Sequence, residues 1–106
     1  MRINGSIEVP DEAIAEFCRK WRITEFGLFG SVLTEEFRPD SDVDVLVRFE
    51  PDARWDLWHI IDMKQELQEI FGRPVDVAER EAVEQSDNPF RKRLILKGSR
   101  VIYTRG

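Results

Sequence analysis

Apolar residues recur at two different spacings along the chain, and each spacing predicts a type of secondary structure. The helical period appears over residues 10–21, where the apolar positions are Ile14, Phe17, Cys18 and Trp21. It recurs over residues 56–71, where Lys64 interrupts an apolar stripe formed by Leu57, Ile60, Ile61, Met63, Leu67, Ile70 and Phe71. A third helix is predicted over residues 88–97, before Gly98.

A spacing of two residues predicts the strands. Over residues 42–49, Val43, Val45, Val47 and Phe49 alternate with Asp42, Asp44, Leu46 and Arg48, which gives the strand one apolar face. Shorter apolar segments predict strands at residues 23–29, 74–78 and 100–104. A short helical turn is expected over residues 32–37. Residues 38–41 are typical of a turn, because Pro39 fixes its own φ angle.

The order of these elements predicts an α/β (α+β) fold. A helix separates the strands at 42–49 and 74–78, so these two should be parallel neighbours. The connection between the strands at 23–29 and 42–49 is short enough for an antiparallel pair. We therefore expect a mixed sheet of three to four strands flanked by helices, in one domain that covers residues 1–106.

Composition and charge narrow the function. The chain has 106 residues with a formal net charge of -5, which argues against a broad surface for nucleic acid or anionic membrane. No apolar run approaches the ~20 residues of a membrane span, and the N-terminus lacks a signal-peptide pattern, so a cytoplasmic location is expected. The single cysteine, Cys18, excludes an intrachain disulfide and is expected to be a buried structural thiol.

Three acidic residues carry the candidate chemistry. Asp42 and Asp44 are two apart on a strand, so their carboxylates project from the same face. If the strand at 74–78 is a parallel neighbour, Asp76 comes up beside them. Carboxylates this close repel one another unless a cation lies between them, and Mg²⁺ prefers such oxygen ligands. Three of them can bind two metal ions roughly 3.5–4 Å apart, as in enzymes that transfer phosphoryl groups.

Gly30 and Ser31 supply a candidate phosphate site. They follow the strand at 23–29, whose end lies beside Asp42 and Asp44 if the two strands are antiparallel. Because Gly30 has no Cβ, the backbone can approach phosphate oxygens closely. Ser31 offers a hydroxyl and an N–H at the start of the following turn.

Here the sequence resembles a known family. Gly30-Ser31, followed at a distance by Asp42-Val43-Asp44 and later by Asp76 between two valines, resembles the signature of the DNA polymerase beta-like nucleotidyltransferases. The segments at 28–33 and 37–47 are closer still to the minimal nucleotidyltransferases (MNT). The resemblance covers nearly the whole chain and implies the polymerase beta-like fold.

The resemblance also implies an activity. Such enzymes transfer a nucleoside monophosphate from a triphosphate, here AMP from ATP, with two Mg²⁺ ions. Asp42, Asp44 and Asp76 would be the catalytic and metal-binding residues, and Gly30 and Ser31 would bind the nucleotide. Many minimal members resemble antitoxins that adenylylate a tyrosine of a HEPN-family ribonuclease toxin, so a HEPN toxin is the expected partner. Direct contact with nucleic acid or membrane is not expected.

Two alternatives stay open. Members of the family often carry arginine three residues after the motif serine, where this chain has Thr34. The chain could therefore be an antitoxin that neutralises its partner by binding alone, with a vestigial nucleotide site. Modification of a small molecule such as an aminoglycoside is a weaker alternative, because those relatives carry an added substrate domain.

Other conspicuous residues have simpler interpretations. His59 has no partner at metal-ligand spacing and is expected to be a surface or hydrogen-bonded histidine. Trp55 and Trp58 are expected to pack rather than to bind a partner. A basic cluster formed by Arg91, Lys92, Arg93, Lys97 and Arg100 is expected to be a solvated helix face, with docking to an acidic partner as the minority interpretation.

Overall fold

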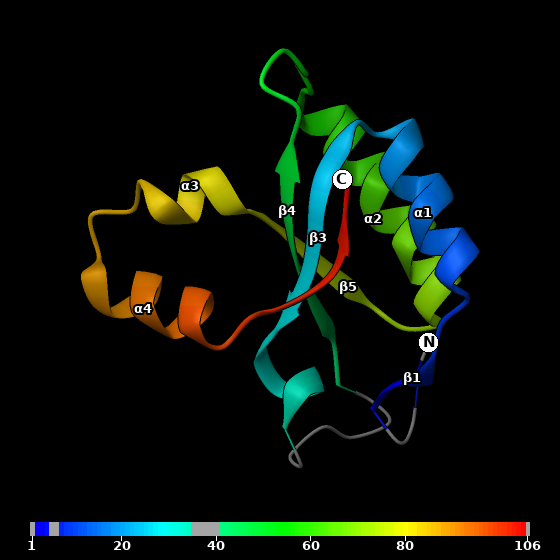
Figure 1. Ribbon diagram of the computed structural model, residues 1–106, viewed down its shortest axis with the longest axis horizontal. Helices are drawn as coiled ribbons and strands as arrows, with labels where there is room; N and C mark the ends of the chain where they lie inside the picture. The colour runs from blue at the N-terminus through cyan, green and yellow to red at the C-terminus, as the bar shows by residue number, and fades with distance from the viewer. Residues whose placement is uncertain (1, 5–6, 35–40, 106) are drawn as a thin grey trace.

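The computed structural model describes residues 2–4, 7–34 and 41–105. The helices are α1 (Asp11–Lys20), the 3-10 helix η1 (Gly30–Leu33), α2 (Leu57–Phe71), α3 (Arg80–Glu84) and α4 (Pro89–Lys97). The strands are β1 (Arg2–Asn4), β2 (Ile7–Glu8), β3 (Ile23–Phe29), β4 (Val43–Phe49), β5 (Val75–Glu79) and β6 (Arg100–Thr104). Figure 1 shows their arrangement.

The main sheet contains four strands in the order β5-β4-β3-β6. β3 is antiparallel to both β4 and β6, whereas β4 and β5 are parallel. α2 makes the crossover between the two parallel strands. The predicted mixed sheet is therefore confirmed, including the direction of each pair around β4. The first two strands form a separate antiparallel ribbon.

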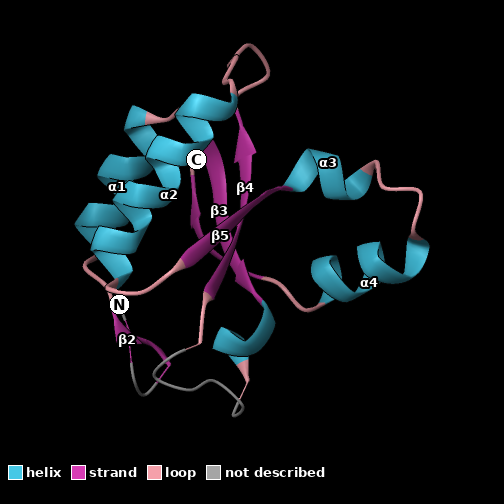
Figure 2. Cartoon of the chain, turned by 180° about the vertical axis from the view of Figure 1, so that it is seen from behind, coloured by secondary structure: helices cyan, strands magenta, loops and turns pink. Residues whose placement is uncertain are grey.

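One face of the sheet carries the core. α1 and α2 lie side by side on this face (Figures 1 and 2). The three valines of β4 point towards them, because alternate residues of a strand share a face. The buried core also includes all four predicted apolar residues of the first helix, Ile14, Phe17, Cys18 and Trp21, together with Met63, Leu67 and Phe71 of α2.

The other face is covered differently. α3 and α4 lie on the opposite side of the sheet from α1 and α2, and project away from it (Figures 1 and 2). The Arg48 guanidinium on this face of β4 donates a hydrogen bond of 2.8 Å to Glu84 in α3. This contact ties α3 to the middle of the sheet. Asp42 and Asp44, which alternate with the buried valines, lie on this same face.

The structure differs from the predictions in several places. The short strands β1 and β2 and the helix α3 were not predicted, because segments of two to five residues are too short to show a period. The 3-10 helix begins at Gly30, two residues before the predicted turn. Leu57 was expected in the core but is 70% exposed, since it is the first residue of α2. The predicted turn at 38–41 lies mostly outside the described residues.

Most of the conspicuous side chains near the start of α2 form contacts within the chain. His59 and Asp56 form a capping box, in which the His59 N–H donates to Asp56 and the Asp56 N–H donates to His59. Trp55 donates a hydrogen bond of 3.0 Å to the Trp21 carbonyl and packs edge-on against its ring. The packing prediction is wrong for Trp58, which is 74% exposed. None of the helices in the described residues is long and apolar enough to span a membrane.

Candidate functional site

Asp44 and Asp76 face each other across two parallel strands. The register of β4 and β5 pairs Val43 with Val75, Asp44 with Asp76, and Val45 with Val77. Residues paired in this way point to the same face of the sheet. Both carboxylates therefore project from the face opposite α1 and α2, as the sequence predicted.

Asp42 belongs to the same group of charges. It lies two residues before Asp44, immediately before β4 begins, and its side chain is exposed. The pKa of Asp44 is raised, first by partial burial of its carboxyl and then by the negative charges of Asp76 and Asp42. The two neighbours thus act on Asp44 electrostatically. This repulsion favours a bound cation, which would relieve it.

Gly30 lies directly against Asp44. The last residue of β3, Phe29, pairs with Asp44 in the antiparallel register, and the chain turns at Gly30 with a φ of 79°. A Cβ atom built on Gly30 would overlap the Asp44 carboxylate oxygen Oδ2. The glycine is required here for two reasons, namely the left-handed backbone and the space occupied by the carboxylate. The predicted position of Gly30 beside Asp44 is confirmed.

Ser31 and Thr34 complete the corner. Ser31 is half-buried within η1, and the Thr34 hydroxyl and N–H both donate hydrogen bonds of 2.9 Å to its carbonyl. Thr34 therefore closes the 3-10 turn that presents Ser31. It supplies no positive charge to the site, in agreement with the departure noted in the sequence.

Two basic side chains approach the acids from other elements. The Lys64 ammonium lies 3.5 Å from Oδ1 of Asp76. Lys64 belongs to α2, on the other face, so its long side chain must reach past β5, which is an edge strand of the sheet. Arg73 donates a hydrogen bond of 3.4 Å to the carbonyl of Ser41, next to Asp42.

Sequence reasoning missed the role of these two residues. Lys64 was noted only as a polar interruption of an apolar stripe, and Arg73 was not singled out. A lysine at a position that otherwise faces the core is a usable signal, because a long charged side chain at a helix edge tends to reach a nearby acid or solvent.

The carboxylates of Asp42, Asp44 and Asp76 are suitable ligands for Mg²⁺, but they do not converge on one point. Three carboxylates on one face supply the oxygen ligands that this ion prefers. Within residues 2–4, 7–34 and 41–105, no three acidic, histidine or cysteine side chains converge closely enough to bind one metal ion as they stand. The Asp76 carboxylate is at present in contact with Lys64.

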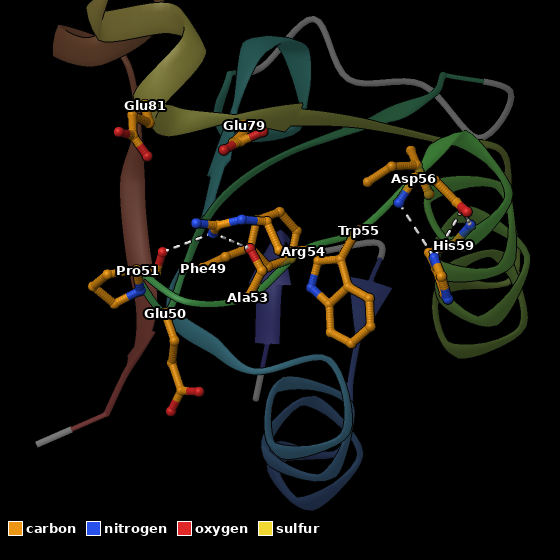
Figure 3. Close-up of a pocket in the computed structure, with 11 residues that line it drawn as sticks. Phe49, Glu50, Pro51, Ala53, Arg54, Trp55, Asp56, His59, Glu79 and Glu81 are labelled. Carbon is orange, nitrogen blue, oxygen red and sulfur yellow. Dashed lines mark hydrogen bonds and ion pairs between the residues drawn. The ribbon is translucent and has the colours of Figure 1, made fainter.

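A cavity of the described residues lies elsewhere. Figure 3 shows it between the loop after β4 and the start of α2, with a volume of about 620 Å³. Phe49 and Glu50 line it at the far end of β4, about 16 Å along the strand from Asp44 at ~3.3 Å per residue. Glu50 in this wall already pairs with Arg22 at 2.5 Å. The cavity is therefore separate from the acidic site.

Comparison with known proteins agrees with this geometry. Residues 10–102 match the family model described as a nucleotidyltransferase domain. A protein adenylyltransferase MntA from Thermococcus cleftensis is 36% identical over 62 residues, which cover 58% of this chain. The chain spans 61% of the length of that relative.

Solved structures show the same fold. The crystal structure of a toxin-antitoxin with AMP-PNP superposes with a TM-score of 0.68 at 17% identity, over 89% of this chain and 73% of that one. The toxin-antitoxin MntA-HepT superposes with a TM-score of 0.60 at 16% identity, over 89% and 69% of the two chains. Together with the match over residues 10–102, these similarities confirm the resemblance noted in the sequence: the chain belongs to the nucleotidyltransferase domain family.

Proposed function

We propose that this protein is a Mg²⁺-dependent antitoxin that transfers AMP from ATP to a tyrosine of a HEPN-family ribonuclease toxin. The observation that carries the proposal is the juxtaposition of Asp44 with Asp76 in β5 and with Gly30 at the end of β3. Acids that bind metal and a backbone corner that can admit phosphate meet at one end of the sheet. The similarity to a protein named adenylyltransferase supports the choice of AMP and of a protein acceptor.

The chemistry requires few residues. The acceptor hydroxyl oxygen attacks the α-phosphorus of ATP, a new P–O bond forms, and the bond to the departing pyrophosphate breaks. Asp76, the most exposed member of the facing pair, accepts the hydroxyl proton. Gly30 and Ser31 bind the phosphates, where the absent Cβ of Gly30 allows close approach and Ser31 donates hydrogen bonds.

Mg²⁺ would be held by Asp42, Asp44 and Asp76. When bound, it neutralises the phosphates and the developing charge on the leaving pyrophosphate. The raised pKa of Asp44, caused by partial burial and then by its two acidic neighbours, is consistent with a site built for a cation. The Lys64 ammonium, 3.5 Å from Asp76, would give up this carboxylate to a bound metal ion.

Mass spectrometry of the acceptor tests the proposal. A HEPN-family protein, as the candidate acceptor, is incubated with the purified protein, Mg²⁺ and each nucleoside triphosphate in turn. The intact mass of the acceptor should rise by one or more AMP units with ATP, and fragmentation should place them on tyrosine. An acceptor that stays unmodified with all four triphosphates contradicts the proposal.

A variant separates catalysis from binding. Asp42→Asn combined with Asp44→Asn removes two metal ligands at exposed or half-buried positions, so the fold should be kept. The double variant should bind the toxin but neither modify nor neutralise it. Full neutralisation by this variant would show instead that stoichiometric binding is the function, an alternative that the Lys64–Asp76 contact and the Thr34 departure favour.

A further inference from the structure

α4 presents an unusual surface for a chain with a net charge of -5. Its nine residues include four cations and no acid. An open groove of about 490 Å³ is lined by four residues of the helix, Phe90, Arg93, Leu94 and Lys97, together with Gly98. Their spacing of three, four and seven places them on one face of the helix. We call these four residues the α4 stripe.

The apolar members of the α4 stripe are uncovered. Phe90 is 73% exposed and Leu94 is 63% exposed, and both are among the most exposed large apolar residues of the described chain. They lie four residues apart, so the two side chains are neighbours on the helix surface. A hydrophobic pair rimmed by charges is typical of a protein-binding site.

The basic members are available for a partner. Arg93 and Lys97 are exposed, and neither forms an ion pair with another residue in the described part of the chain. By contrast, Arg48 on β4 is engaged within the chain: it pairs with Glu84 at 2.8 Å and with Glu25 at 3.4 Å. A partner that fits the α4 stripe should therefore present acidic and apolar side chains at helical spacing.

The position of α4 relates it to the candidate active site. In the antiparallel pair of β3 and β6, Leu28 lies opposite Arg100. Gly30, at the start of η1, lies two residues after Leu28, and Gly98, at the end of α4, lies two residues before Arg100. Both glycines thus lie past the same end of the sheet, with adjacent strands only ~5 Å apart. The C-terminal end of α4 therefore lies on the same side of the molecule as the Gly30 corner.

We propose that the α4 stripe docks an acidic, amphipathic helix of the acceptor protein and so delivers the acceptor hydroxyl to the nucleotide. This inference rests on the proposed transfer to a protein. The apolar pair supplies buried area, and Arg93 and Lys97 select for a negatively charged partner.

Binding to the HEPN-family protein used as the candidate acceptor tests the inference. Two variants are compared with the wild type by calorimetry: Phe90→Ser with Leu94→Ser, and Arg93→Glu with Lys97→Glu. Each should raise the Kd at least tenfold. Arg19→Glu with Arg54→Glu is the matched control, because it changes the charge equally at exposed positions on α1 and the loop after β4. Equal Kd values for the wild type and both α4 variants would overturn the inference.

Zero-length crosslinking supplies an independent readout. A carbodiimide joins lysine to a carboxylate in contact, so Lys97 should become linked to an acidic helix of the partner. Circular dichroism and the Tm of each variant show whether the fold is kept. Crosslinks from Lys97 only to a second copy of this chain, or binding of single-stranded RNA that the α4 variants alone lose while partner binding is unchanged, would also overturn it.

The same experiments separate this inference from the proposed function. If the wild type binds the partner through α4 but transfers no AMP, the transfer fails and the docking surface stands. If the wild type modifies the partner and the α4 variants do so with an unchanged KM for it, the docking surface fails and the transfer stands. In the expected result, the α4 variants raise the KM for the partner and leave binding of Mn²⁺ and AMP-PNP unchanged.

Discussion

The Cα of Gly30 lies so close to the carboxylate of Asp44 that no side chain fits between them. The contact joins the end of β3 to the start of β4, across the antiparallel register in which Phe29 pairs with Asp44. Gly30 thus serves both the fold, by adopting a left-handed backbone, and the site, by leaving space for the Asp44 carboxylate. The corner must be glycine for the acid to hold its place.

Gly30→Ala should therefore strongly reduce transfer. The substitution forces a Cβ into the Asp44 carboxylate and into a backbone with a φ of 79°. The left-handed conformation alone should lower the free energy of unfolding by about 1–2 kcal/mol. The displaced acid should reduce kcat/KM by a factor of 100 or more, as for loss of one strong electrostatic contact at roughly 2.7–4 kcal/mol.

Gly72→Ala is the matched control for this prediction. Gly72 has a φ of 72° at the end of α2, but a Cβ there would meet no other atom within 4 Å. Chemical denaturation should show a comparable loss of stability in both variants. If Gly72→Ala retains activity while Gly30→Ala loses it, the loss arises from the Asp44 contact; equal activities would refute that explanation.

Lys64→Met should lower the Mg²⁺ concentration needed for activity. Lys64 lies 3.5 Å from Asp76 and competes with the metal for its carboxylate. An exposed pair of this kind contributes up to about 1 kcal/mol, which corresponds to a roughly two- to fivefold change in half-saturating Mg²⁺. A titration of initial rate against Mg²⁺ measures it.

Lys20→Met provides the comparison for Lys64. Lys20 forms a similar exposed pair with Glu66 at 3.0 Å, away from the three acids. Its removal should leave the Mg²⁺ dependence unchanged. An increase in half-saturating Mg²⁺ for Lys64→Met would mean that Lys64 assists metal binding rather than competing with it.

Asp44 should reduce the stability of the metal-free protein at neutral pH. Its pKa is raised in the folded state by partial burial and then by Asp76 and Asp42, so folding favours the protonated form. Stability should therefore increase as the pH falls through the folded pKa towards the unfolded value. Asp44→Asn should raise the Tm in EDTA at pH 7, and its advantage over the wild type should shrink in acid.

Asp52→Asn should show the opposite sign. Hydrogen bonding to the Arg22 guanidinium lowers the pKa of Asp52 in the folded state. Its ionised form therefore stabilises the protein above the unfolded pKa, and that stabilisation is lost as the pH falls through the folded pKa. The variant should have a lower Tm at pH 7 and approach the wild type in acid. The same direction of change for both variants would contradict the assigned causes.

Cys18 should be inert in the folded protein. Its side chain is fully buried between α1 and the core, and burial raises the pKa of the thiol to about 12. Alkylation by iodoacetamide at pH 8 should be slower on the order of a thousand-fold than in urea. Rapid labelling of the native protein would show that α1 opens readily.

Much of the fold was predictable from local pattern. The alternation of valine with Asp42 and Asp44 fixed which face of β4 is buried, and the intervening helix fixed the parallel direction of β5. These two facts predict that Asp76 lies on the strand next to Asp44. The register that pairs the two residues is an observation of the structure.

Other features depend on contacts that no local pattern reveals. Lys64 reaches Asp76 from the opposite side of the sheet, which depends on β5 being an edge strand. α3 spans only five residues and is tied to the sheet through the contact of Glu84 with Arg48. The exposure of Phe90 and Leu94 likewise follows from how α4 stands away from the sheet, since their spacing is equally typical of a buried helix face.

Anomalous diffraction from Mn²⁺ tests the central claim most directly. Crystals of the protein grown with Mn²⁺ and AMP-PNP should show two peaks roughly 3.5–4 Å apart, bounded by Asp42, Asp44 and Asp76, with the phosphates against Gly30 and Ser31. The Asp76 carboxylate should have left Lys64. Peaks at another place on the chain, or a bound nucleotide with no metal beside these acids, would contradict the account.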